Sequence, residues 1–318
     1  MIRQKWKNGS MNHTTLAIVG GGAAGLTAAI YAAREKLDAV LIDDDPGGQI
    51  LQASVVDNYP GIPQISGEEL GEALRQHAED KGAVFWEYRV NNIRREQEHF
   101  LLTLDDGAET KTVRAQSVIY AVGCHHRLLG IEGEQRLTGH GVSYCALCDA
   151  AFYPDKTVAV VGGGNTALGD ALILARIAKT VYLVHRRDTF RASAELVEAV
   201  SQTENIEIIF HTIPLALCGD KHITGIRLQN TINHTERLLQ TDGVFVAVGM
   251  EPDTSMVSQL VKCDENGYII AGEDGITSCP GFFAAGDIRT KPLRQVVTAV
   301  ADGASCVKSA ESWLQKKG

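Results

Sequence analysis

Two short apolar runs with an alanine-rich stretch between them open the regular part of the chain. Leu16–Val19 is an apolar run typical of a buried strand, and Ala39–Ile42 is a second one. Between them, glycines are followed by Ala23–Lys36, whose composition favours a helix. The order strand, glycine turn, helix and strand predicts a βαβ unit.

The same pattern recurs further along the chain. The segment Ala17–Gly22 (AIVGGG) matches Ala159–Gly164 (AVVGGG) at an offset of 142 residues, and the same offset places Leu41 on Leu183. The matching therefore extends to the end of the second strand, and the spacing is too long for a solenoid repeat. We expect an α/β protein with two Rossmann-like dinucleotide-binding domains.

Three further apolar segments end at a glycine, namely Ser117–Gly123, Gly243–Gly249 and Gly281–Gly286. Such segments are either sheet strands that turn at their ends or backbone that passes close to a bound cofactor. The third continues into Asp287, which favours the cofactor interpretation.

Composition and charge narrow the class of protein. The chain has 318 residues, enough for about two domains, and its 32 glycines fit close turns or backbone packed on a ligand. A net charge of −9 predicts no attraction to nucleic acid or to an anionic membrane. No apolar run reaches the roughly 18 residues of a transmembrane helix. Seven cysteines are too few for a disulfide scaffold, so we expect a cytoplasmic protein.

Residues 1–10 precede the regular pattern. They contain no apolar core of the kind that a secretory signal carries. We expect them to be a tail, either a vector-derived segment or an alternative start, with Met11 as the natural start of the chain.

The first glycine turn has the spacing of a dinucleotide site. Gly20, Gly22 and Gly25 follow a predicted strand and open a predicted helix. In such a turn the first glycine permits the bend, the second admits a diphosphate and the third brings the helix against the strand. Asp43, at the end of the second strand, suits the hydroxyls of an unphosphorylated adenosine ribose. A purely structural glycine turn is the alternative.

The second glycine turn is Gly162-x-Gly164-x-x-Ala167, and alanine is an allowed third residue. Asn165 and Thr166 stand where its helix begins, and a helix N-terminus favours an anion. We therefore expect these residues to bind a second dinucleotide.

Basic residues follow the second strand of this unit. The offset of 142 places His185 where the first unit has Asp43, and Arg186, Arg187 and Arg191 follow. Guanidinium groups match the geometry of a phosphate, so this site suits the 2′-phosphate of NADP. A solvated basic cluster is the alternative. Two dinucleotide sites in one chain suggest electron transfer from NADPH to a bound flavin.

Cys145 and Cys148 form the one C-x-x-C of the sequence. A structural zinc site would lack further ligands, so a redox dithiol is favoured and no metal is expected. Asp149 follows directly and either exchanges a proton during thiol–disulfide exchange or is an ordinary acidic residue of a first helical turn. The other five cysteines are expected to be small buried side chains.

Taken together, these motifs closely resemble the low-molecular-weight, bacterial-type thioredoxin reductases among the pyridine nucleotide-disulfide oxidoreductases. The resemblance extends from about Thr15 to about Leu314. The matching segments are Gly20–Gly25, Pro46–Gln49, Asp57–Gly61, Cys145–Asp149, Gly162–Ala167, His185–Arg187 with Arg191, Gly286–Asp287 and Arg294–Val296. A C-x-x-C just before the second glycine turn is the most specific of them.

The resemblance implies a discontinuous FAD domain, residues 11–125 and 250–318, into which an NADPH domain, residues 126–249, is inserted. It also implies hinges near residues 123–127 and 248–251, about which the inserted domain rotates between two states. A homodimer is the implied assembly.

The resemblance also assigns roles to single residues. Gly20, Gly22, Gly25 and Asp43 would bind the ADP half of FAD, and Gly48, Gln49 and Asn58 would lie near the flavin, as would Asp287, Gln295 and Val296. Electrons would pass from NADPH to FAD, to the Cys145–Cys148 disulfide and then to thioredoxin. Cys148 would face the flavin, Cys145 would exchange with the partner and Asp149 would be the general acid.

Some residues depart from the family pattern. Ala146-Leu147 stands between the cysteines where Ala-Thr is commoner, and Val122 replaces a usual threonine. A glutaredoxin-like or peroxidase-linked partner is the near alternative to thioredoxin, although the few residues before the first strand disfavour the peroxidase type. The arginines argue against a ferredoxin-fed relative, and the cysteine pair with Asp149 argues against a dinucleotide sensor without turnover.

Overall fold

The computed structural model describes residues 13–44, 47–53 and 55–317, and two compact units emerge from it. The first unit combines the described residues up to His125 with those from Glu251 onward, and the second runs from His126 to Met250. The expected tail, residues 1–10, and Pro46 of the Pro46–Gln49 motif lie outside the described residues. In the part that is described, no helix has the length and apolar character needed to span a bilayer.

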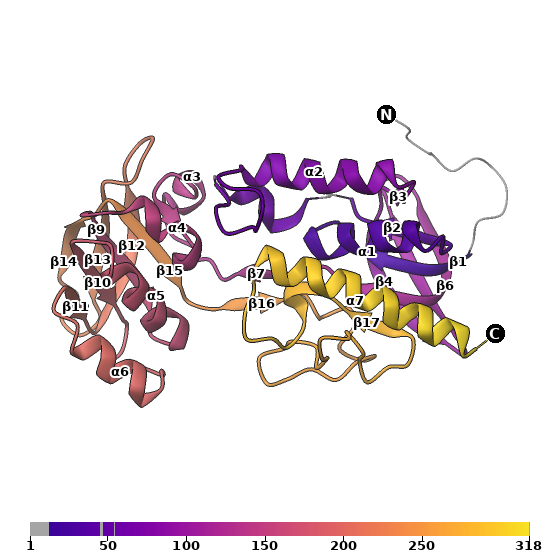
Figure 1. Cartoon of the computed structure of the whole chain (residues 1–318). Coiled ribbons are helices and arrows are strands. Elements are labelled where there is room, and N and C mark those ends of the chain that lie inside the picture. Colours follow the sequence, from indigo (N-terminus) through magenta and orange to yellow (C-terminus); the bar gives the residue numbers. More distant parts are fainter. Residues whose placement is uncertain (1–12, 45–46, 54, 318) are drawn as a thin grey trace. The chain divides into compact units, whose positions relative to one another are not determined.

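The first unit is built on a mixed sheet with the strand order β3-β2-β1-β6-β5-β4, and β17 pairs with β6. Figure 1 shows the N-terminal part of this unit in indigo to magenta and the C-terminal part in orange to yellow. Strands β1, β2, β3, β6 and β17 are parallel, whereas β4, β5 and β6 form an antiparallel meander. These strands are β1 (His13–Val19), β2 (Ala39–Ile42), β3 (Val84–Trp86), β4 (Arg89–Glu96), β5 (His99–Asp105), β6 (Thr110–Tyr120) and β17 (Phe282–Ala284). The other elements are α1 (Ala23–Arg34), α2 (Gly67–Asp80), α7 (Val296–Gln315) and the 3₁₀ turns η1 (Gly48–Gln52) and η3 (Gly286–Ile288).

Strand β1 explains how this sheet is covered, because its side chains alternate between two cores. Leu16 and Ile18 lie in a core with residues of α1 and α7, and Ala17 and Val19 lie in a second core with the meander. Both faces are buried, which is why the strand reads as a continuous apolar run in the sequence.

The second unit repeats this architecture with a parallel sheet in the order β11-β10-β9-β15-β8. Its strands are β8 (Val142–Ser143), β9 (Thr157–Gly162), β10 (Thr180–Val184), β11 (Ile206–Ile209) and β15 (Gly243–Ala247), with a separate antiparallel sheet of β12 (Thr212–Cys218), β13 (Gly225–Asn230) and β14 (Glu236–Gln240). Its helices are α3 (Glu134–Leu137), α4 (Ala146–Asp149), the 3₁₀ turn η2 (Ala150–Phe152), α5 (Asn165–Ala175) and α6 (Ala194–Ser201). Val158 and Val160 of β9 pack with residues of α5, and Val161 packs with those of β12 and β13.

Two short strands, β7 (Cys124–His126) and β16 (Met250–Pro252), carry the chain from one unit to the other and pair with each other. Gly123 and Gly249 beside them have φ of +74° and +113°, in a region of the backbone map that favours glycine.

The predicted βαβ repeat is confirmed. The first copy is β1, α1 and β2, and the second is β9, α5 and β10, with the glycine turn between strand and helix each time. The apolar segments that end at glycine are also strands, β6, β15 and β17.

Candidate functional site

The three glycines of the first turn meet three different surroundings. Gly20 has φ of +103°, and a β-carbon on it would lie 2.6 Å from the carbonyl oxygen of Ala121. A β-carbon on Gly25 would lie 1.8 Å from the carbonyl oxygen of Gly20, so helix α1 approaches the strand too closely for any side chain. Nothing lies within 4 Å of the corresponding position on Gly22. The turn therefore has no room for a side chain at Gly20 or Gly25. It is open at Gly22, where a diphosphate would approach.

Asp43 and the segment after it complete this turn. A carboxylate oxygen of Asp43 accepts a hydrogen bond from the backbone N–H of Gly21. The N–H of Gly47 donates to the carbonyl of Gly21 at 3.0 Å, and a β-carbon on Gly48 would lie 3.1 Å from Cα of Gly22. The structure thus brings the predicted residues Gly22, Asp43 and Gly48 together.

A second group of predicted flavin residues gathers at the start of α7. Nδ2 of Asn58 donates to Oε1 of Gln295 at 2.9 Å, although 237 positions separate them in the sequence. Val296 packs against a small core that contains Ile50, in the same 3₁₀ turn η1 as the half-buried Gln49. These contacts bring the segments of Gln49, Asn58 and Gln295 to one region of the unit.

Asp287 lies in the turn η3 directly after β17. Its Oδ1 atom is buried and has no hydrogen-bond partner among the described residues. Burial raises the pKa of this carboxyl, and Lys291 and Arg294 oppose the rise. An unpartnered buried acceptor is costly, so this oxygen suits a hydroxyl-bearing ligand such as the ribityl chain of FAD. Together with the open side of Gly22, it fits the expected cofactor.

The second glycine turn has the same design. A β-carbon on Gly162 would lie 2.4 Å from the carbonyl oxygen of Ala247, whereas the position on Gly164 is open. Asn165 and Thr166 are exposed at the first positions of α5. Backbone N–H groups at this helix start can therefore receive a diphosphate.

The loop after β10 folds back onto this turn. The N–H of Arg191 donates to the carbonyl of Gly163 at 2.8 Å, and the N–H of Ser193 donates to Oδ1 of Asn165 at 2.8 Å. His185 is buried, and its Nε2 donates to the carbonyl of Thr189 at 3.0 Å. His185 therefore stabilises the loop from within.

The arginines on this loop are accessible. Arg186 and Arg191 are exposed and Arg187 is half-buried. None of the three forms an ion pair with a carboxylate of the described residues, in contrast to Arg75 or Arg89 elsewhere in the chain. Guanidinium groups of this kind, beside a helix start, suit the 2′-phosphate of NADPH.

Cys145 and Cys148 form a disulfide at the start of α4. The chain turns there because the N–H groups of Cys148 and Asp149 both donate to the carbonyl of Cys145, at 3.2 and 3.1 Å. Ser143 supports the first cysteine, since its Oγ accepts from the N–H of Cys145 at 3.1 Å. Both cysteines are half-buried, so the disulfide is partly accessible.

Asp149 lies half-buried at the end of α4. Burial raises its pKa, and a hydrogen bond from Ser143 opposes the rise. Burial and the Asp149 carboxylate also raise the pKa of Tyr153, to about 12. A carboxyl with a raised pKa near a disulfide can hold a proton and give it to a leaving thiolate.

Sequence reasoning missed three polar residues whose surroundings only the structure shows. Ser143 gave no motif, and the half-buried Asp170 of α5, whose pKa burial raises to about 7, looked like a surface residue. Asp302 could have been noticed as a charge within the otherwise small and apolar run 296–307. Among the described residues no three histidines, cysteines or acidic residues are grouped as metal ligands would be.

Comparisons with known proteins decide the family. The family model described as pyridine nucleotide-disulphide oxidoreductase matches residues 14–303. The chain belongs to the pyridine nucleotide-disulphide oxidoreductases.

Relatives place this oxidoreductase more narrowly. It is 38% identical over 301 residues to the thioredoxin reductase of Listeria innocua, which covers 94% of this chain and 93% of the relative. It is 40% identical over 294 residues to the thioredoxin reductase of Mycoplasma genitalium, 92% of either chain. The solved thioredoxin reductase of Streptococcus pyogenes superposes with a TM-score of 0.90 at 36% identity, over 96% of this chain and all of that one. The oxidoreductase is thus an FAD- and NADPH-dependent flavoprotein disulfide reductase.

Proposed function

We propose that this oxidoreductase uses NADPH to reduce the disulfide of a thioredoxin, with Cys145 and Cys148 as the exchanging pair. The disulfide between these residues, partly accessible and followed by a carboxyl of raised pKa, is the observation that carries the proposal. The relatives named thioredoxin reductase support thioredoxin as the partner.

The two glycine turns divide the cofactors. The ADP half of FAD is held by the first glycine turn and the acid after it, namely Gly20, Gly22, Gly25 and Asp43. The residues toward the flavin are Gly48, Gln49, Asn58, Asp287, Gln295 and Val296. The diphosphate of NADPH is held by the second glycine turn and the start of its helix, namely Gly162, Gly164, Asn165 and Thr166. The 2′-phosphate is bound by Arg186, Arg187 and Arg191, and His185 supports their loop. Bound FAD supplies a carrier that takes an electron pair from NADPH and delivers it to the Cys145–Cys148 disulfide.

Exchange with the partner then uses the protein's own thiols. The thiolate of Cys145 attacks one sulfur of the thioredoxin disulfide, a mixed disulfide forms and the second thioredoxin sulfur leaves as a thiolate. Asp149 protonates this leaving thiolate. Cys148 then attacks the sulfur of Cys145, which releases the other thioredoxin thiolate and restores the Cys145–Cys148 disulfide.

Replacement of Cys148 by serine tests this function. NADPH-driven reduction of thioredoxin should vanish, while the yellow colour and flavin absorbance of the purified protein should persist. The matched control is Cys218→Ser, because Cys218 is a free cysteine of the same unit. Retained thioredoxin reduction in the Cys148→Ser protein would overturn the proposal.

The cysteine pair and the NADPH turn lie on one unit, residues 126–250. Since both must reach the flavin of the other unit, we propose that the second unit rotates about the segments 123–127 and 248–251. A covalent cross-link that ties the two units should stop turnover while one half-reaction persists. Undiminished turnover in the cross-linked protein would contradict the rotation.

We also propose a cytoplasmic homodimer. The resemblance to bacterial-type thioredoxin reductases supports both features. Light scattering on the purified holoenzyme measures its mass in solution, and a monomer at micromolar concentration would contradict the dimer.

A further inference from the structure

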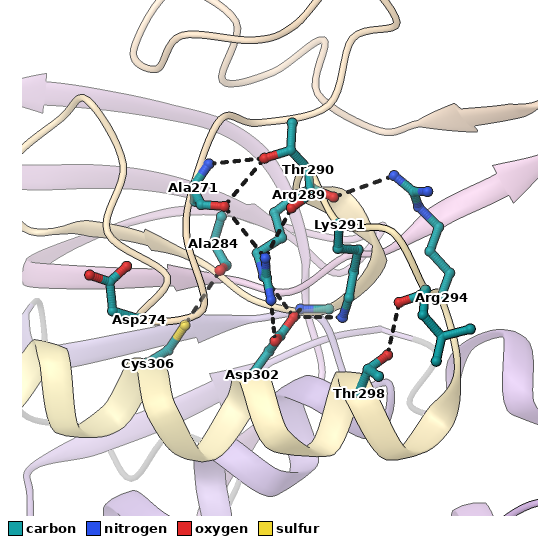
Figure 2. Close-up of polar contacts among 12 residues, drawn as sticks. Ala271, Asp274, Ala284, Arg289, Thr290, Lys291, Arg294, Thr298, Asp302 and Cys306 are labelled. Carbon is teal, nitrogen blue, oxygen red and sulfur yellow. Dashed lines mark hydrogen bonds and ion pairs between the residues drawn. The ribbon is translucent and has the colours of Figure 1, made fainter.

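The carboxylate of Asp302, on helix α7, accepts several hydrogen bonds from the turn that carries Asp287 and from the residues that follow it. Asp302 accepts hydrogen bonds from Nε and Nη2 of Arg289, at 2.8 and 2.6 Å. Its Oδ2 atom also accepts from Nζ of Lys291 at 2.8 Å and from the backbone N–H of Gly286 at 2.9 Å. Figure 2 shows Arg289 and Lys291 converging on Asp302 from above the helix.

All three charged side chains are buried. The exposed fraction is 6% for the side chain of Arg289, 5% for Asp302 and 3% for Lys291. Arg289 and Asp302 already form a bidentate pair, so Lys291 brings a second buried cation to one carboxylate. A buried cation without a counter-charge is strongly unfavourable, so the surroundings of Lys291 should contain a further anion.

Asp287 supplies the neighbouring carboxyl group: burial raises its pKa, and Lys291 lowers it. It follows Gly286, whose N–H is bound to the same Oδ2 atom as Lys291, and its own Oδ1 has no partner among the described residues. The groups that act on its pKa, after burial, are Lys291, Arg294, Asp302 and Arg289. Asp287 in turn contributes to the raised pKa of Cys124 and of Tyr268, although burial is the larger cause in both. When Asp287 is ionised, the two acids Asp287 and Asp302 stand among three cations, Lys291, Arg294 and Arg289.

We propose that Lys291 is a positioning residue for the flavin site: it keeps the buried Asp287 ionised, so that Oδ1 accepts a hydrogen bond from a hydroxyl group of the FAD ribityl chain. Asp302 fixes both partners, because it binds Lys291 and the backbone of the turn. This inference rests on the proposed role of Asp287 in FAD binding.

Lys291 and Arg289 differ in their hydrogen bonds, and therefore in their structural roles. Arg289 also donates to the backbone carbonyl groups of Thr290 and Ala271, at 3.0 and 3.4 Å, and so ties the chain together. Lys291 makes its described hydrogen bond to Asp302 alone. Its removal leaves the bidentate pair of Arg289 and Asp302 intact, so the Lys291→Met protein is expected to fold.

The rate of FAD release from the diluted holoenzyme, followed by flavin fluorescence between pH 6 and pH 8, tests the proposal. Wild-type release should change little over this range. Without Lys291, Asp287 should take up a proton as the pH falls, so Lys291→Met should release FAD about tenfold faster at pH 6 than at pH 8. Lys262→Met, an exposed lysine of the same unit, should behave as wild type.

Asp287→Asn distinguishes this inference from the role of Asp287 itself. That variant should release FAD faster at every pH, and the double variant Lys291→Met/Asp287→Asn should match it. A pH-independent acceleration in Lys291→Met, or additive effects in the double variant, would show a purely structural lysine and overturn the inference. Unchanged FAD release in Asp287→Asn would instead overturn the proposed role of Asp287, and this inference with it.

Discussion

The imidazole ring of His185 lies directly against Gly163, so close that a β-carbon on Gly163 would stand 2.1 Å from ring atoms. The glycine turn and the arginine-bearing loop are therefore packed together at this point. Gly163 is the middle glycine of the turn, which the G-x-G-x-x-A motif itself leaves unspecified.

Gly163→Ala should weaken NADPH binding, because the added methyl group must displace His185 and with it the loop of Arg186 and Arg187. We expect the KM for NADPH to rise about tenfold and the flavin content to stay unchanged. Gly169→Ala is the control, since nothing lies within 4 Å of its β-carbon position in α5. Equal NADPH kinetics in the two variants would contradict the packing argument.

The double substitution Arg186→Ala/Arg187→Ala should change the choice of nicotinamide cofactor. Each charge-assisted contact to a phosphate contributes roughly 1.5–3 kcal/mol, so the preference for NADPH over NADH should fall about a hundredfold or more. Steady-state kinetics with each cofactor measure this ratio. Arg237→Ala, an exposed arginine of β14, should leave it unchanged. A loss that is equal for NADPH and NADH would place the 2′-phosphate elsewhere.

Asp149→Asn should separate function from stability. Removal of a general acid should slow thioredoxin reduction about a hundredfold, while reduction of FAD by NADPH persists. Because burial raises the pKa of Asp149, there is a pH range, between its pKa in the unfolded state and its pKa in the folded state, in which the folded state keeps a proton that the unfolded state has lost. This contribution to stability is complete below the unfolded pKa and is lost as the pH rises through the folded pKa. Asp149→Asn should therefore melt higher than wild type at pH 8, with a smaller difference near pH 4.

Asp170 provides a second test of the same linkage. Burial raises its pKa from 3.8 to about 7. The contribution of the protonated carboxyl to the stability of the folded state should therefore be complete below pH 3.8 and be lost as the pH rises to 7. With allowance for partial solvent screening, Asp170→Asn should gain on the order of 1–3 kcal/mol over wild type at pH 8. Thermal unfolding of the holoenzyme at pH 5 and pH 8 measures the gain. A gain in the exposed control Asp220→Asn would contradict this explanation.

Local pattern was sufficient for the two βαβ units. Leu16–Val19 and Ala39–Ile42 are strands because buried parallel strands are apolar throughout, and Gly20, Gly22 and Gly25 mark the turn between them. The chain signals each of these features within a few residues. The disulfide position is equally local, since Cys145 and Cys148 are three positions apart.

Tertiary structure decided which charges meet. Asp302 is 11 positions from Lys291 and 16 from Gly286, and only the packing of α7 beside the turn brings them to one buried point. Asn58 and Gln295 pair across 237 positions in the same way. Burial also decided the pKa of Asp170, which the sequence presents as an ordinary acidic residue of a helix.

The sequence by itself determined the repeated fold, the two dinucleotide turns and the redox pair, because each depends on short-range spacing that the backbone geometry requires. The buried network around Asp302, the unpartnered oxygen of Asp287 and the inward position of His185 depend on contacts between distant segments. Those contacts form only when folding brings distant segments of the chain together, and the burial that results shifts the pKa values of the groups.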